Sequence, residues 1–217
     1  TGSPDVGWAL RAKAGTKRVS LELGGNAAVI LEDCDNLPAA AKRCAAGAFA
    51  YAGQVCISVQ RIYVRRPLYA AFIESLLKAS KALTLGDPLS ETTDIGPMIS
   101  AQALKKTSEW VAEALKAGAE VLCGGEAVGP CFQPTVLAKV PASCKVSCQE
   151  AFAPIVVVEA YDDFEEALKK TNASEYGLQA GLYARDWTQI RRAHEVLEVG
   201  GLIVNDVPTL RADAMPY

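Results

Sequence analysis

The 217-residue sequence predicts an α/β fold with a mostly parallel, open β-sheet flanked by helices. Short apolar stretches alternate along the chain with longer helical stretches, which is typical of parallel strands joined by crossover connections. The stretch 27–31 is apolar throughout, as expected of a strand that is covered on both faces. No repeat or low-complexity segment interrupts this alternation, so we expect one sheet.

The composition indicates a soluble globular protein. Half of the residues are hydrophobic, but no run of eighteen apolar residues is present, so we expect no membrane contact. The net charge is −3 with both signs interspersed, which argues against a nucleic-acid surface. No charged and apolar leader opens the sequence, so we expect a cytoplasmic location.

The cysteines do not form a pattern that predicts disulfides or a metal site. There are seven, at positions 34, 44, 56, 123, 131, 144 and 148. An odd and irregularly spaced set does not fit a disulfide framework. A structural zinc site needs four ligands, and the only histidine, His194, is far in sequence from Cys144 and Cys148. We therefore predict no metal.

The first elements can be assigned from capping residues and periodicity. Ser3 and Pro4 begin a helix that runs to about Ala14 and stops at Gly15. Apolar and polar residues then alternate over 19–23, which predicts a strand with one apolar face. The apolar stretch 27–31 predicts a second strand, and an Ala-rich helix follows at 38–51.

The rest of the chain continues the same alternation. Strands are predicted at 60–64, 120–123, 155–160, 178–183 and 202–205. Helices are predicted at 68–83, 100–116, 163–171 and 187–197. Glycines and prolines mark a loop over 85–97.

Two polar residues stand out as candidates for catalysis. Cys56 follows Gly53 directly after the Ala-rich helix, and Glu22 precedes the pair Gly24-Gly25. A thiol is a useful nucleophile where it is partly exposed and something helps it to ionise. Either residue alone is unremarkable, because free cysteines are usually buried and glutamates are usually solvated.

Together these stretches make a specific resemblance. The sequence contains Glu-Leu-Gly-Gly at 22–25 and Gly-Gln-Val-Cys at 53–56, and the two residues Glu22 and Cys56 are 34 positions apart. Gln-Glu-Ala-Phe-Ala-Pro follows at 149–154, and Thr-Gly-Ser-Pro-Asp-Val-Gly opens the chain at 1–7. In this order and spacing the four motifs resemble those of the aldehyde dehydrogenase superfamily, over essentially the whole chain.

The resemblance implies a reaction and its residues. Cys56 would be the nucleophile and Glu22 the general base in the oxidation of an aldehyde to a carboxylic acid, through a thiohemiacetal and a thioester. The cofactor would be NAD, with NADP possible. Residues implied to meet the cofactor are Gly2 and Ser3 near its diphosphate, Leu23 and Gly24, Glu150 at the nicotinamide ribose, and Phe152 near the nicotinamide. Gln149 and Ala153 depart from the commonest family residues, Glu and Gly.

The resemblance also implies a longer protein. Residues 1–22 would end a dinucleotide-binding domain, and residues 23–217 would form the catalytic domain. The rest of the cofactor domain and a C-terminal arm would lie outside this sequence, together with an asparagine that helps the Cys56 N–H to hold the oxyanion. The full-length protein would be a homodimer or a homotetramer.

The substrate is expected to be a small aldehyde. The pocket would be lined by Val55, Ile57 and the loop after Asn205. Neither neighbour of Cys56 is basic, which argues against a phosphorylated substrate. Arg211 could reach a carboxylate or be solvated, and Arg61 is assigned no substrate role because it lies in the strand after Cys56.

Three other interpretations stay open. The chain by itself could be an inactive folding or oligomerisation module, because most of the dinucleotide domain is not in it. It could also keep a residual esterase activity, since the thiol and the base are together. A hydrolase pair of Cys56 with His194 is a weaker alternative, because His194 lies among charged residues of a helix that is expected to face solvent.

Overall fold

The computed structural model describes residues 1–212 and 214. Its α-helices are α1 (Pro4–Lys13), α2 (Leu37–Phe49), α3 (Arg66–Lys81), α4 (Ala101–Lys116), α5 (Lys145–Cys148), α6 (Phe164–Asn172) and α7 (Trp187–Val196). Its strands are β1 (Ala27–Leu31), β2 (Val59–Arg65), β3 (Glu120–Cys123), β4 (Ala127–Val128), β5 (Cys131–Phe132), β6 (Thr135–Ala138), β7 (Ile155–Tyr161), β8 (Gln179–Tyr183) and β9 (Gly201–Val204). Most of the predicted elements are present, with boundaries that agree to about two residues, the usual uncertainty of helix ends.

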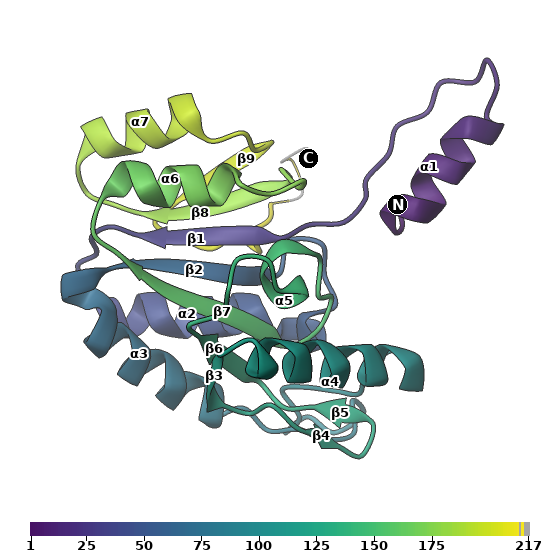
Figure 1. Ribbon diagram of the computed structural model, residues 1–217, viewed down its shortest axis with the longest axis horizontal. Coiled ribbons are helices and arrows are strands. Elements are labelled where there is room, and N and C mark those ends of the chain that lie inside the picture. Colours follow the sequence, from purple (N-terminus) through teal and green to yellow (C-terminus); the bar gives the residue numbers. More distant parts are fainter. Residues whose placement is uncertain (213, 215–217) are drawn as a thin grey trace.

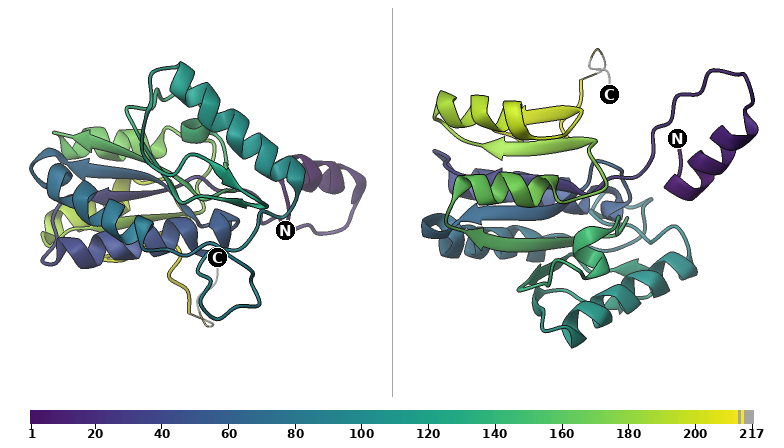
Figure 2. Two further views of the ribbon diagram at one scale, coloured as in Figure 1. Left: turned by 90° about the horizontal axis from the view of Figure 1, so that it is seen from below. Right: turned by 45° about the horizontal axis from the view of Figure 1, so that its top comes forward.

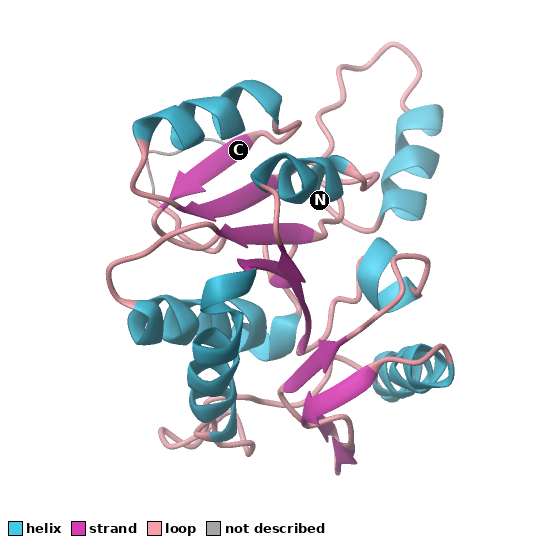
Figure 3. Cartoon of the chain, turned by 60° about the vertical axis from the view of Figure 1, so that its left-hand side comes forward, coloured by secondary structure: helices cyan, strands magenta, loops and turns pink. Residues whose placement is uncertain are grey.

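The described residues contain one seven-stranded sheet in the order β3-β6-β7-β2-β1-β8-β9. Every neighbouring pair is parallel except β3 and β6, which are antiparallel. Helices α2 and α3 lie on one face of this sheet, and α6 and α7 lie on the other (Figures 1 and 3). The predicted fold class, a mostly parallel sheet flanked by helices, is confirmed.

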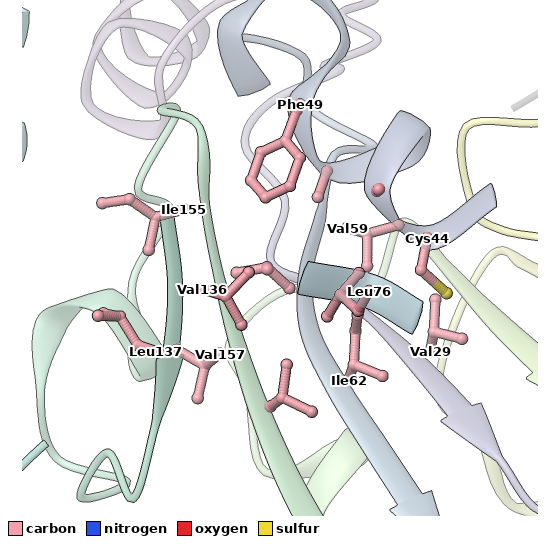
Figure 4. Close-up of a cluster of buried hydrophobic side chains, with 14 of the residues drawn as sticks. Val29, Cys44, Phe49, Val59, Ile62, Leu76, Val136, Leu137, Ile155 and Val157 are labelled. Atoms are coloured by element: carbon pink, nitrogen blue, oxygen red, sulfur yellow. The ribbon is translucent and has the colours of Figure 1, made fainter. Parts of the chain in front are cut away.

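The central strand β1 is buried on both faces because helices cover both. Val29 and Leu31 belong to the core cluster formed with α2 and α3, whereas Ala28 and Ile30 belong to the cluster formed with α6 and α7. Figure 4 shows Val29 beside Cys44 of α2 in the larger cluster. Successive side chains of a strand point to opposite faces, so an apolar stretch without alternation is what two covered faces require.

One predicted strand is wrong. No described strand pairs with residues 19–23, which form an extended segment between α1 and β1. The backbone N–H of Gly2 donates to the carbonyl oxygen of Glu22 at 3.2 Å, and Val19 is 40% exposed. The alternating pattern is real, but a strand is stabilised by a ladder of bonds to a neighbour, and none of the described strands lies beside this segment.

Four short elements were not predicted, namely α5 and the strands β4, β5 and β6. Strand β6 has only four residues, and all four are buried between β3 and β7. Such short stretches carry no clear periodicity, and pairing with distant strands stabilises them.

The helix α1 and its connecting segment stand apart from the sheet, beyond the amino ends of the parallel strands (Figures 1 and 2). The predicted cap is present, because the Ser3 Oγ accepts from the Val6 N–H at 3.4 Å. Gly15, with φ of 62°, follows the helix in the left-handed conformation that glycine favours. The predicted division of the chain at residues 22 and 23 stays a prediction.

All seven cysteines are free thiols in the structure. In the described part of the chain, no group of three or more His, Cys, Asp or Glu side chains is arranged to hold a metal ion. None of the described helices is both long and apolar enough to cross a bilayer.

Candidate active site

Cys56 follows an unusual turn at the end of α2. A 3-10 turn, Ala50–Gly53, contains three successive residues with positive φ: Tyr51 at 54°, Ala52 at 55° and Gly53 at 66°. Left-handed conformations cost a non-glycine residue about 1–2 kcal/mol each. At Gly53 a side chain is also excluded, since a Cβ there would lie 2.1 Å from the carbonyl oxygen of Ala153. The turn is therefore held by tertiary contacts.

The side chain of Gln54 braces this turn. Its Nε2 donates to the Tyr51 carbonyl oxygen at 3.3 Å, and its Oε1 accepts from the backbone N–H of Ile99 at 2.8 Å. Ser58, just after the turn, donates its hydroxyl to the Ala48 carbonyl oxygen at 3.2 Å. Gln54 within the Gly-Gln-Val-Cys motif and Ser58 after it thus hold the backbone on the two sides of Cys56.

The Cys56 thiol is half-buried at the amino end of β2. Burial raises its pKa above the ordinary thiol value, and the negative charges of Glu150 and Glu22 raise it further. The backbone N–H groups of Cys56 and Ile57 act in the opposite direction, because they stabilise a thiolate. The thiol is mostly protonated at neutral pH, so a base or a pH rise is needed to ionise it.

Glu22 lies on the same side of the sheet as Cys56. It is half-buried at the end of the extended segment, close enough for its charge to act on the Cys56 thiol. The next residues bring the two segments into contact, because a Cβ on Gly25 would lie 1.9 Å from the Cys56 carbonyl oxygen. The structure therefore brings together the two residues for which the sequence predicts catalytic roles.

Glu150 joins the same cluster from the loop before β7. Its Oε1 accepts from the backbone N–H of Gly25 at 2.9 Å. Its other oxygen, Oε2, lies against Gly24, where a Cβ would be 2.6 Å away. Burial raises the pKa of this carboxyl group, although the Gly25 N–H and the positive charge of Lys106 oppose that shift.

Phe152 is 40% exposed and adopts a positive φ of 50°. A narrow crevice lies beside Phe152. It is lined by the Gly-Gln-Val-Cys motif, which contributes Val55, and by the loop at 149–154, which contributes Glu150 and Phe152. Ile57, the other residue predicted to line the substrate pocket, is only 4% exposed. The roles of Val55 and Ile57 toward a substrate stay predictions.

The remaining predicted cofactor residues lie around the extended segment. Gly2 bonds to the carbonyl of Glu22, Ser3 caps α1, and the side chain of Leu23 packs against Gly7. A Cβ at Gly7 would lie 2.3 Å from the Leu23 side chain, so a larger residue there would require Leu23 to move. These contacts connect the opening motif to the Glu-Leu-Gly-Gly motif.

The cluster lies at the amino edge of the parallel strands. Cys56 precedes β2, Glu150 precedes β7, and Glu22 lies before β1. Ligands of open parallel sheets usually bind at the carboxyl ends of the strands. This site is on the opposite edge, on the side where α1 stands (Figure 1).

Two further residues reach Glu150 and were not predicted. The hydroxyl of Tyr176 accepts from the Glu150 N–H at 3.4 Å, and Lys106 Nζ donates to the Glu150 carbonyl oxygen at 3.4 Å. Burial lowers the pKa of Lys106, which also lies 4.1 Å from the ring centroid of Trp110. No sequence signal identifies them, because each comes from an element that only tertiary packing brings near the motif.

Other candidates lie elsewhere or have structural contacts. Arg61 is 5% exposed and donates to backbone carbonyls of Asn26, Lys170 and Thr171, which agrees with its assignment to a strand rather than to the substrate. His194 is exposed on α7, and the charges that act on the Cys56 thiol are those of Glu150 and Glu22, so the geometry gives no support to a Cys–His pair. Arg211 is exposed in the last described residues.

Comparison with known proteins identifies the family of this chain. The aldehyde dehydrogenase family model matches residues 1–217. The 3-sulfolactaldehyde dehydrogenase of Priestia aryabhattai is 46% identical over 217 residues, which cover 100% of this chain and 46% of that protein. The chain therefore spans about half the length of the curated relatives that it matches.

Solved structures show the same likeness. Aldehyde dehydrogenase 21 from Physcomitrella patens, solved with the reaction product succinate, superposes with a TM-score of 0.97 at 42% identity, covering 100% of this chain and 45% of that one. Glyceraldehyde-3-phosphate dehydrogenase GapN from Methanocaldococcus jannaschii, solved with NADP, superposes with a TM-score of 0.94 at 37% identity, covering 100% and 47%. The 217-residue chain belongs to the aldehyde dehydrogenase family.

Proposed function

We propose that this chain carries the nucleophile and the general base of an NAD(P)-dependent enzyme that oxidises a small aldehyde to a carboxylic acid. The observation that carries the proposal is the meeting of Cys56, Glu22 and Glu150 at one edge of the sheet, from three separate motifs. Membership of the family supports the reaction class.

The first role belongs to Cys56. Its thiolate adds to the carbonyl carbon of the aldehyde, and the carbonyl π electrons move to oxygen, which gives a thiohemiacetal. The backbone N–H groups of Cys56 and Ile57, which already favour a thiolate, are donors of the kind that stabilises the developing negative charge. Departure of a hydride from the tetrahedral carbon then leaves a thioester on Cys56.

The second role belongs to Glu22. Its carboxylate takes a proton from water, the water oxygen attacks the thioester carbon, and the C–S bond breaks. The acid product leaves, and Cys56 returns as a thiol once it is protonated. Glu22 is half-buried, and its charge acts on the Cys56 thiol, which supports its role as the base at this site.

The residues that would hold the cofactor fit a dinucleotide. When bound, NAD(P) accepts the hydride. Glu150 offers a carboxylate, and Gly24 leaves one of its oxygens clear of any side chain, which suits a pair of ribose hydroxyls. Phe152 offers a 40% exposed ring beside it. The dinucleotide site would be completed by Gly2, Ser3, Leu23 and Gly24. We propose NAD, with NADP as the alternative that one structural relative carries.

The substrate would meet Val55 and Ile57 beside Cys56. No basic residue flanks the thiol, so an unphosphorylated aldehyde is favoured over a phosphorylated one. A homodimer or homotetramer of the full-length protein, and a cytoplasmic location, stay predictions.

The test is substitution of the thiol in the full-length protein. Cys56→Ser should abolish aldehyde-dependent reduction of NAD, followed at 340 nm in the usual way for NADH. The control is Cys34→Ser, which removes a half-buried free thiol from the loop after β1, at the opposite edge of the sheet. Turnover that survives in Cys56→Ser would refute the proposal.

A further inference from the structure

The side chain of Gln60, the second residue of β2, reaches the loop that carries Glu150. Its Nε2 donates to the Gln149 carbonyl oxygen at 2.7 Å, and its Oε1 accepts from the Ala151 N–H at 3.0 Å. One amide group therefore bonds to the backbone on both sides of Glu150, which limits rotation of the peptides that orient its side chain. The same Nε2 donates to the Val146 carbonyl oxygen at 2.8 Å.

Asn26, the residue before the neighbouring strand β1, holds the same loop. Its Nδ2 donates to the Ser147 carbonyl oxygen at 2.8 Å and more weakly to that of Gln149 at 3.5 Å. The backbone carbonyl of Asn26 accepts from Arg61 Nη2 at 2.9 Å. Asn26, next to Gly25, and Gln60, four residues after Cys56, thus hold the same loop at two points.

These bonds are strong constraints because they are shielded from water. Gln60 is 5% exposed and Asn26 is 3% exposed. A buried donor or acceptor that loses its partner costs about 1–3 kcal/mol, so the Gln60 amide, the Asn26 Nδ2 and the backbone atoms that they contact stay paired. The loop they hold includes Phe152 with its positive φ, a conformation that the surrounding structure must maintain.

We propose that Gln60 is a positioning residue of the active site, which orients the carboxylate of Glu150 toward the ribose of the dinucleotide. This inference depends on the proposed function. Gln60 itself touches only backbone atoms, so its effect on catalysis would pass through Glu150. A reacting group displaced by about 1 Å can lower the rate by about a hundredfold.

The test compares Gln60→Met with Gln179→Met in the full-length protein. Methionine keeps the length of the side chain and removes the amide. Gln179 is a matched control because it is 4% exposed at the start of strand β8 of the same sheet, and its side chain has no bond to the loop among the described residues. We expect Gln60→Met to lower kcat/KM for NAD by about ten- to a hundredfold. The KM for the aldehyde should stay as in the control.

A second readout does not depend on turnover. Hydrogen exchange, followed by mass spectrometry of peptides that cover 147–154, should accelerate in Gln60→Met and not in Gln179→Met. Equal exchange in the two variants, or equal kcat/KM for NAD, would overturn the positioning role. If Gln60→Met does not fold, Gln60→Glu keeps the acceptor for the Ala151 N–H, and its exchange and kinetics are judged by the same two criteria.

The two proposals fail differently. A wild-type protein without aldehyde-dependent NAD reduction would refute the proposed function. An active wild type with unchanged Gln60 variants would refute only the positioning role.

Discussion

The Glu150 carboxylate accepts a hydrogen bond at 2.9 Å from the backbone N–H of Gly25, a residue 125 positions earlier in the chain. The contact joins the loop before β7 to the turn after Glu22. It needs glycine on both sides, because a Cβ on Gly24 would lie 2.6 Å from Glu150 Oε2, and one on Gly25 would lie 1.9 Å from the Cys56 carbonyl oxygen. The two glycines let three motifs meet at one point.

Gly25→Ala should therefore disrupt both the fold and the site. The new methyl group would collide with the Cys56 backbone, which cannot rotate away, and we expect a loss of about 1–3 kcal/mol in the free energy of unfolding, as for overpacked cores. Gly96→Ala is the control, because its Cβ would lie at an ordinary 3.6 Å from Pro88. Urea unfolding measures both, and equal stability of the two variants would contradict the close contact.

The reactivity of Cys56 should rise with pH. Burial and the two carboxylates hold the pKa of the thiol above its ordinary value, so the thiolate fraction is small at neutral pH and increases as the pH approaches that raised pKa. The rate of alkylation by iodoacetamide, measured from neutral to alkaline pH, should show a midpoint above that of an ordinary exposed thiol. A midpoint below the ordinary thiol value would contradict this environment.

Neutralising either acid should shift that midpoint down. Glu22→Gln and Glu150→Gln each remove a negative charge that disfavours the thiolate, so alkylation should become faster at neutral pH. Glu109→Gln removes a charge from the exposed face of α4 and serves as the control. An upward shift in Glu22→Gln would mean that Glu22 acts on the thiol mainly as its proton acceptor.

Glu22→Gln should also separate the two halves of the reaction in the full-length protein. Thioester formation needs Cys56, whereas hydrolysis needs the base, so the variant should release about one equivalent of NADH per site and then nearly stop. General-base catalysis contributes about 10²–10⁴-fold, which sets the expected loss in steady-state rate. Rapid-mixing absorbance measures the burst, and a variant with unchanged steady-state turnover would exclude Glu22 as the base.

Arg61 should matter for stability. It is buried and serves carbonyl groups at the end of α6 and at Asn26, so Arg61→Met would leave several of them unpaired. Hydrogen bonds to charged groups contribute about 1.5–3 kcal/mol each, and we expect a loss of about 3 kcal/mol. Arg66→Met breaks only an exposed pair with Asp162 and should leave the unfolding midpoint almost unchanged. Equal effects would contradict a structural role for Arg61.

The 217-residue chain by itself is expected neither to bind NAD detectably in calorimetry nor to reduce it with an aldehyde. The residues that would meet the dinucleotide lie along one edge of the sheet, and they offer few contacts. Binding in the micromolar range would contradict this expectation. Because Cys56 and Glu22 are close together, the chain could still hydrolyse an activated ester, and Cys56→Ala should abolish that activity.

The sequence alone predicted most of the fold, because its signals are local. The apolar stretch of β1, the Ser3 cap of α1, whose Oγ accepts from the Val6 N–H at 3.4 Å, and the periodicity of α4 each depend on nearby residues. The strand predicted at 19–23 failed for the opposite reason. Its pattern is suited to a sheet, but a strand needs a partner, and no local signal reports whether one is present.

The sequence by itself also determined the family and predicted the chemistry, since the motifs and their order single out Cys56, Glu22 and Glu150. Only the tertiary structure decided how that chemistry is held. The amide of Gln60, the hydroxyl of Tyr176 and the ammonium group of Lys106 reach Glu150 from β2, from the loop before β8 and from α4. Residue types and their spacing in the sequence indicate which chemistry a side chain can perform. Which side chains meet depends on the packing of elements that lie far apart in the chain.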